Sequence, residues 1–382
     1  MTRRELLKSA GGLGVAALPG LWSERADRTT EQPIAPPALR GSLRHIAAAR
    51  GLKFGAAIPW EELVGYPAYA NLVIQQCGIL VPEVELKWNA LRPAPEEFDF
   101  RGADRLYAFA ALHGMLLRGQ PLIWEQALPQ WFMSAVNAQN AKSVMMRHIS
   151  TVVAHFAGKT HSWDVVNEAI QLEDGRIDGL KVTPWLRFLG PEYIDTAFHI
   201  AHAADPNATL VLNENWLEPE NYAAERKRQA MLALLTQLKR NGVPIHALGV
   251  QSHVSAEMQT TGPRFKRFLQ AIEDLGLAIM ITEMDVRDQR LPSNVEERDQ
   301  LVAKQYQDYL SFMLQFTSLT TIVTWGLTDR YTWLARAHPR ADGLAVRPLP
   351  YDADLNPKPA WEAIRRAFEK APQRATTSYR DL

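Results

Sequence analysis

The sequence has little cysteine and no excess charge of either sign. Cys77 is the single cysteine among 382 residues, which excludes an intramolecular disulfide framework and a cysteine-based metal site. Lysine plus arginine and aspartate plus glutamate both number 42, so the formal net charge is zero. This balance provides no global basic field for nucleic acid or for an anionic membrane. The composition therefore favours a neutral partner.

Long apolar runs are missing as well. The stretch 10–18 is weakly apolar and too short to span a bilayer as a helix. It follows Arg3 and Arg4, an order that resembles a twin-arginine export signal; a disordered tail with two arginines is the alternative. A proline-containing stretch then reads as a linker. We expect residues 1–40 to be signal and linker, the protein to be exported to the periplasm or beyond, with no membrane span in its mature form, and residues 41–382 to be one folded domain.

Apolar patterning predicts eight strands separated by helices. Short β-rich runs recur at 52–60, 78–88, 115–124, 161–170, 209–215, 247–254, 277–286 and 320–329. Stretches with helical apolar spacing lie between most of them. Eight strands alternating with helices indicate a parallel sheet closed into a barrel, so the expected fold class is α/β, a single (β/α)8 TIM barrel. A doubly wound open sheet is the alternative, but no G-x-G-x-x-G follows the first strand and no P-loop is present.

Polar and aromatic side chains gather where the predicted strands end. In a parallel barrel the carboxyl ends of all strands open on one face, so these side chains should converge in one cleft. They are Trp60, Glu85, Lys87, Trp124, Glu125, Asn167, Glu168, Asn213, Glu214, Gln251, His253, Glu283, Asp285, Trp325 and Asp329. Satisfied salt bridges around a barrel mouth are the alternative. Because a buried unpaired carboxylate is costly, Glu168 and Glu283 at the ends of strongly apolar strands favour a functional site.

Two carboxylates in an aromatic cleft suggest glycoside hydrolysis. One carboxyl group donates a proton to the leaving oxygen, while the other stays ionised to attack the anomeric carbon, which requires two different environments. Asn167 can donate a hydrogen bond beside the acid without adding charge. His253 and Asp285 can form a relay that orients the nucleophile Glu283. The sequence carries no metal cluster, and we expect no cofactor.

Several long motifs carry a family resemblance, in matching order from about residue 45 to residue 370. They include "WDVVNEAI", "GVQSHV", "ITEMDVR", "TWGLTDRYTWL" and "DPNATLVLNEN". They resemble glycoside hydrolase family 10, the endo-β-1,4-xylanase family. The resemblance implies that Glu168 is the general acid/base beside Asn167 and that Glu283 is the nucleophile, supported by His253 and Asp285. It also implies a retaining double displacement, for which the two carboxyl groups stand roughly 5 to 5.5 Å apart.

The residues implied to bind sugar differ in part from that family's usual pattern. The implied set is Glu83, Lys87, Gln120, Trp124, Glu125, Asn215, Gln251, Trp325 and Trp333. Val84 replaces an asparagine, Gln120 and Glu125 replace histidines, Ala127 replaces a glutamine, and the aromatic beside Asn215 moves by one position to Trp216. Because an unpaired buried polar group costs roughly 1 to 3 kcal/mol, such changes should weaken or redirect xylan recognition.

Glu125 is the most informative of these differences, since a carboxylate replaces an imidazole near the predicted reaction centre. It either binds a different hydroxyl pattern or an amino sugar, or raises the pKa of its neighbours. Alternatively it pairs with a nearby lysine or arginine, such as Lys87, and changes little.

The expected function is a retaining endo-β-1,4-glycosidase that acts on xylan or a related β-linked polysaccharide or oligosaccharide. A carbohydrate-binding barrel that has lost turnover is an alternative from another class. A hydrolase of a non-xylan glycan, such as an exopolysaccharide, differs from the first hypothesis in substrate. Every catalytic position implied by the resemblance is present, which favours an enzyme.

Overall fold

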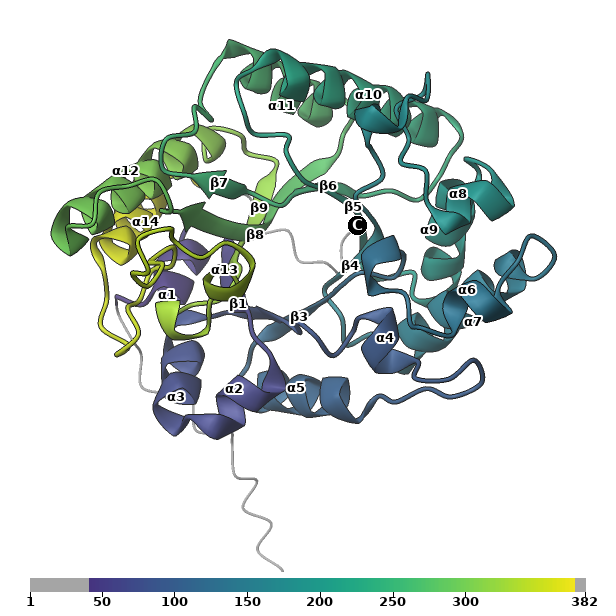
Figure 1. Cartoon of the computed structure of the whole chain (residues 1–382), viewed down its shortest axis with the longest axis horizontal. Coiled ribbons are helices and arrows are strands. Elements are labelled where there is room, and N and C mark those ends of the chain that lie inside the picture. Colours follow the sequence, from purple (N-terminus) through teal and green to yellow (C-terminus); the bar gives the residue numbers. More distant parts are fainter. Residues whose placement is uncertain (1–40, 375–382) are drawn as a thin grey trace, which may run out of the picture. The chain divides into compact units, whose positions relative to one another are not determined.

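The computed structural model describes residues 41–374, so the predicted signal and linker lie outside the described residues. Its strands form a closed parallel barrel with helices around it (Figure 1). The hydrogen-bonded order is β6-β5-β4-β3-β2-β1-β9-β8-β7, and pairing of β6 with β8 closes the ring. The strands are β1 (Lys53–Ala57), β2 (Ile79–Val81), β3 (Leu116–Gly119), β4 (Ser162–Asn167), β5 (Thr209–Glu214), β6 (Ala247–Val250), β7 (His253–Ser255), β8 (Ala278–Arg287) and β9 (Leu319–Thr324). The short strand β7 follows β6 in the chain and pairs with β8, as β6 does. Counting β6 and β7 as one position, the barrel has eight strand positions, as predicted.

Helices follow the strands and cover the outside of the ring. They are α1 (Leu43–Ala48), α2 (Trp60–Gly65), α3 (Pro67–Gln76), α4 (Trp88–Leu91), α5 (Arg101–Leu112), α6 (Phe132–Ala135), α7 (Ala141–His155), α8 (Pro184–Leu189), α9 (Tyr193–Ala204), α10 (Tyr222–Arg240), α11 (Pro263–Asp274), α12 (Val295–Met313), α13 (Leu334–Ala337) and α14 (Pro359–Lys370), with 3₁₀ turns η1 (Glu125–Ala127), η2 (Leu172–Asp174) and η3 (Asp329–Tyr331). Local sequence explains several starts: proline opens α3 and α11, and Asn221 and Asn294 cap α10 and α12. In the part of the chain described, no helix is long and apolar enough to cross a membrane.

The strands are shorter than the predicted runs, so the placement of Trp60 and Lys87 on strands was wrong. β1 ends at Ala57 and β2 at Val81. Pro59 and Pro82 follow closely, and proline has no N–H to continue a β ladder. Among the residues predicted at strand ends, Trp60, Glu85, Lys87, Trp124 and Glu125 therefore lie in segments that follow the strands, whereas Asn167, Asn213, Glu214, His253, Glu283 and Asp285 lie on strands.

The core has separate layers outside and inside the barrel. Leu210 and Leu212 belong to the large cluster shared with the helices, whereas Val211 between them packs in a small cluster with Met280. Successive side chains of a strand point to opposite faces, so Val211 faces the barrel interior. Side chains fill the barrel interior, so a site can form only at the end of the barrel, where the carboxyl ends of the strands lie.

Candidate active site

A cavity of about 310 Å³ lies at the carboxyl ends of the strands. Most of the residues predicted from the sequence line it: Glu83, Lys87, Gln120, Trp124, Asn167, Glu168, Asn215, Gln251, His253, Glu283, Trp325 and Trp333. Asp285 and Glu125 lie behind this lining. Gln126, Trp216 and Arg287 also line the cavity and were not among the predicted site residues.

Glu168 follows the last residue of β4 and has a left-handed backbone, with φ of 55°. Such a φ is unfavourable for a residue with a β-carbon and is typical of functional sites. Its N–H donates to the Asn213 carbonyl at 2.9 Å, which holds the turn. The residue as a whole is 8% exposed. Its carboxylate accepts from Gln251 at 3.1 Å and from Gln126 at 3.2 Å.

Glu283 lies within β8 and is also 8% exposed. The Asn213 side-chain amide donates to its Oε1 at 2.7 Å. The His253 Nε2 lies 3.3 Å from its Oε2. Both oxygens of this carboxylate are therefore held by the protein, which orients the side chain into the cavity.

A chain of amide side chains connects the two carboxylates. The Asn213 amide nitrogen also donates to Asn167 Oδ1 at 2.8 Å. The Gln251 amide nitrogen lies 3.4 Å from the same oxygen and donates to Glu168. The hydrogen bonds to Asn167 Oδ1 thus fix the orientations of the Asn213 and Gln251 side-chain amides relative to each other. Asn213 was named only as a strand-end residue, because its contact with Glu283 joins positions 70 residues apart.

His253 forms hydrogen bonds with Glu283 and with the fully buried Asp285, the latter at 3.0 Å from Nδ1. Trp333 Nε1 donates to the same Asp285 oxygen at 2.7 Å. Burial lowers the pKa of His253, but Asp285 and Glu283 outweigh burial and raise the pKa to about 10. The imidazole is therefore protonated at neutral pH, and both of its N–H groups can donate to carboxylates.

Glu125 pairs with a lysine, as one of the two alternatives had it, but the partner is Lys181 and not Lys87. Lys87 instead lies over the Trp124 ring, 5.7 Å from its centroid. The loop after Glu168 folds back on itself, because Ile170 and Leu180 form an antiparallel bridge and the Lys181 N–H donates to the Ala169 carbonyl at 2.8 Å. This fold-back brings Lys181 to the site.

Other positions that depart from the family pattern are occupied by protein contacts. The Gln120 amide donates to the carbonyls of Pro82 and Glu83 at 2.7 and 3.1 Å. Asn215 Oδ1 accepts from Lys227 at 2.6 Å. Burial raises the pKa of the Glu83 carboxyl to about 7. The Gln120 and Asn215 side chains are therefore already engaged by protein groups.

Two further cavities adjoin the central one. One, of about 590 Å³, shares His253 and Arg287 with it, and the other, of about 620 Å³, shares Glu168 and Asn215 with it. Trp216 lines all three cavities. The site is therefore an extended cleft that can hold a chain of several units.

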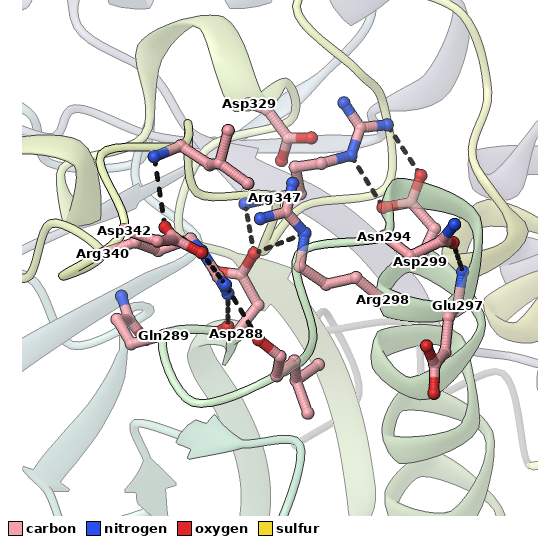
Figure 2. A network of polar contacts seen from close by, with 12 residues as sticks. Asp288, Gln289, Asn294, Glu297, Arg298, Asp299, Asp329, Arg340, Asp342 and Arg347 are labelled. Carbon is pink, nitrogen blue, oxygen red and sulfur yellow. Dashed lines mark hydrogen bonds and ion pairs between the residues drawn. The ribbon is translucent and has the colours of Figure 1, made fainter.

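A polar network supports the rim of this cleft next to Arg287 (Figure 2). Asp288 accepts from the Arg347 backbone N–H at 3.0 Å, while the Arg340 guanidinium donates to the carbonyls of Asp288 and Leu291. Arg347 forms a two-fold hydrogen bond with Asp299 of α12, at 2.8 and 2.7 Å. The loops after β8 and β9 are thus tied to one helix.

Comparison with known proteins gives a consistent set of matches. The model of glycosyl hydrolase family 10 matches residues 42–367. A β-1,4-xylanase of Dictyoglomus thermophilum is 34% identical over 309 residues, covering 78% of this chain and 84% of the relative. Endo-1,4-β-xylanase 5 of Pyricularia oryzae is 31% identical over 99% of this chain and 90% of its own. The crystal structure of xylanase 10B from Thermotoga petrophila in complex with xylobiose has a TM-score of 0.78 and 30% identity, covering 86% of this chain and 97% of that one.

Proposed function

Because this chain belongs to glycosyl hydrolase family 10, we propose that it is a retaining endo-β-1,4-xylanase or acts on a closely related β-linked polysaccharide. The glycoside hydrolase activity follows from the family and its xylanase relatives. Our proposal adds the two catalytic glutamates, the retaining mechanism and the substrate. A related structure holds xylobiose, which supports a xylo-oligosaccharide as ligand.

One observation carries the proposal: two buried carboxylates face one cavity in different environments. Glu168 accepts from the amides of Gln126 and Gln251, and the Lys181 ammonium that lies 3.4 Å from it is shared with Glu125. Glu283 contacts the protonated His253. A cation beside Glu283 favours its ionised form, as a nucleophile requires.

In the first step, the Glu283 carboxylate attacks the anomeric carbon from one side. The bond from that carbon to the leaving oxygen breaks, its electron pair stays on the oxygen, and Glu168 gives that oxygen its proton. The amide of Asn213 holds Glu283 in line for the attack. The product of this step is a glycosyl ester on Glu283 and a free leaving-group sugar.

In the second step, water attacks the same anomeric carbon where the leaving group stood. Glu168, now a carboxylate, accepts a proton from that water, and the ester bond to Glu283 breaks with its electron pair returning to the carboxylate. Two inversions give net retention. As charge returns to Glu283, the His253 N–H stabilises it.

The test is product analysis on β-1,4-xylan, mixed-linkage β-glucan, cellulose and β-mannan. We expect release of β-configured xylo-oligosaccharides, detected by proton NMR immediately after cleavage. Release of α-configured products would contradict the retaining mechanism. Binding without products by both the wild type and Glu168→Gln would favour a carbohydrate-binding barrel instead.

A second candidate substrate is a β-glycan other than xylan. The Gln120 amide donates to two backbone carbonyls, and Val84 is 47% exposed and apolar. Both replace groups expected from the family resemblance to contact sugar hydroxyls, and Gln120 lines the central cavity, so a substrate with a different hydroxyl pattern is the second candidate. Faster cleavage of another glycan in the same panel would identify it.

Export is also part of the proposal. It depends on Arg3 and Arg4 ahead of a short apolar stretch, which lie outside the described residues. Recovery of the chain from the periplasm or medium, and its loss after Arg3→Lys with Arg4→Lys, tests it.

A further inference from the structure

Lys181 joins two carboxylates that come from different loops of the barrel. Its ammonium pairs with Glu125 of η1 and lies 3.4 Å from Glu168 Oε2. The side chain of Lys181 is 18% exposed, that of Glu125 19% and that of Glu168 10%. Charges so close and so poorly solvated interact more strongly than surface ion pairs.

Glu125 has its ion pair with this lysine. Its second oxygen is enclosed and accepts no hydrogen bond from any residue that the structure describes. A carboxylate in such a position is costly unless a cation compensates it. Burial lowers the pKa of Lys181, but Glu125 and Glu168 outweigh burial and raise it, so the lysine is a cation at neutral pH.

We propose that Lys181 and Glu125 act as a pair of positioning residues that sets the pH at which Glu168 holds its proton. The inference rests on the proposed role of Glu168 as acid/base. Lys181 favours the carboxylate form of Glu168, and Glu125 opposes it by holding Lys181 and by adding a negative charge. Removing one member of the pair should therefore move the protonation of Glu168 in the opposite direction from removing the other.

Other charged groups around the site stay the same in every variant. They are Glu83, Lys87, Glu173, Glu214, Arg226, Lys227, His253, Glu283, Asp285 and Arg287. Glu214 is paired with Lys227 at 2.8 Å, and Glu283 contacts His253. Because these groups are the same in all variants, a difference between variants reports the effect of Lys181 and Glu125.

The variants are Lys181→Met, Glu125→Gln and the double variant. We expect the titration midpoint of Glu168 to rise by about one unit in Lys181→Met, to fall by about one unit in Glu125→Gln, and to lie between them in the double variant. Lys181→Arg keeps the charge and should stay near the wild type. Lys304→Met and Glu96→Gln, in exposed ion pairs, are the matched controls and should not shift the midpoint.

Two measurements separate this inference from the proposed function. The first is a carbon-13 NMR titration of the Glu168 carboxyl group, assigned by its loss in Glu168→Gln, which needs no turnover. The second is the pH dependence of kcat/KM on xylohexaose, whose leaving sugar must receive a proton. Because a general acid must be protonated, its alkaline limb should follow the NMR midpoints.

Opposite shifts support the pair. Shifts in the same direction, or none beyond the controls, overturn it. If one single variant does not fold, the wild type, the other single variant and the double variant still decide: a double variant whose midpoint lies further from the wild type than that of the folded single variant refutes compensation. Inactivity on all glycans would refute the proposed function. The NMR titration would still show whether Lys181 and Glu125 shift the protonation of Glu168 in opposite directions.

Discussion

The side-chain amide of Asn213 donates a 2.7 Å hydrogen bond to Oε1 of Glu283. The orientation of that amide is fixed from behind, because Thr282 Oγ1 donates to Asn213 Oδ1 at 2.7 Å. Asn213 is fully buried, so no water can take over its role without rearrangement. The proposed nucleophile is therefore held by two consecutive hydrogen bonds.

Asn213→Ala should lower kcat/KM about 10- to 100-fold, because a hydrogen bond to a charged group contributes roughly 1.5 to 3 kcal/mol. Steady-state kinetics on xylo-oligosaccharides measures this loss. Thr282→Val removes only the bond that orients the amide and should cost less than Asn213→Ala. Equal losses in the two variants would mean that the effect is structural.

Glu168 and Glu283 should respond differently to the leaving group. Glu168→Ala should keep cleavage of an aryl glycoside whose leaving group needs no proton, yet lose cleavage of xylo-oligosaccharides by about 1000-fold or more. Glu283→Ala should lose both, since no covalent intermediate can form. Stopped-flow release of the phenol measures the first step. Equal sensitivity of Glu168→Ala to both leaving groups would contradict its role as the acid.

His253 should make stability fall as the solution becomes alkaline. The pKa of His253 is raised to about 10 in the folded chain, above its ordinary value of about 6.5. Its contribution to the free energy of unfolding is therefore fully present below about pH 6.5 and is lost as pH rises through about 10. Guanidinium unfolding of wild type and His253→Asn across this range measures it. Parallel pH curves for the two proteins would contradict the prediction.

The buried pair of Arg118 and Asp164 should matter more to stability than an exposed pair. Both side chains are about 1% exposed, and two guanidinium nitrogens donate to the two carboxylate oxygens. Asp164→Ala leaves a buried unpaired guanidinium, which should cost about 3 to 5 kcal/mol. Asp308→Ala, in an exposed pair with Lys304, should cost less than about 0.5 kcal/mol. Urea unfolding of both variants checks the contrast, and similar losses would refute it.

The barrel could be predicted from the sequence because every strand carries its own apolar run. The alternation of these runs with helical stretches gives the number of strands in the barrel. The sequence was also sufficient to bring Glu168, which directly follows β4, and Glu283, which lies within β8, to one end of the barrel. Contacts between distant loops were not predictable in this way. Lys181 reaches Glu168 only through the fold-back bridge of Ile170 with Leu180, and neither residue carries a signal of that pairing.

Trp216 shows the same limit at a single residue. The sequence showed only that this aromatic is displaced by one position from the family's usual pattern. In the structure Trp216 has a φ of 54° and is 53% exposed. A bulky residue with a left-handed backbone is rare and strained. Its position follows from the backbone turn after β5, which no spacing in the sequence encodes.

Trp216 should therefore act in binding the longer part of a substrate. It lines the central cavity and both neighbouring ones, and an exposed aromatic face suits the apolar face of a pyranose ring. Trp216→Ala should raise KM for xylohexaose about 10-fold, while kcat/KM on an aryl xylobioside with a small leaving group changes by less than about twofold. Tyr222→Ala removes a 73% exposed aromatic from outside the described cavities and is the control.

A second variant at Trp216 separates binding from backbone strain. Trp216→Gly removes the same ring as Trp216→Ala, but glycine adopts a positive φ without the penalty of a β-carbon. The glycine variant should therefore be more stable than the alanine variant by about 1 kcal/mol, with the same KM. If KM instead followed stability across the two variants, the tryptophan would act through the loop conformation and not as a surface for sugar.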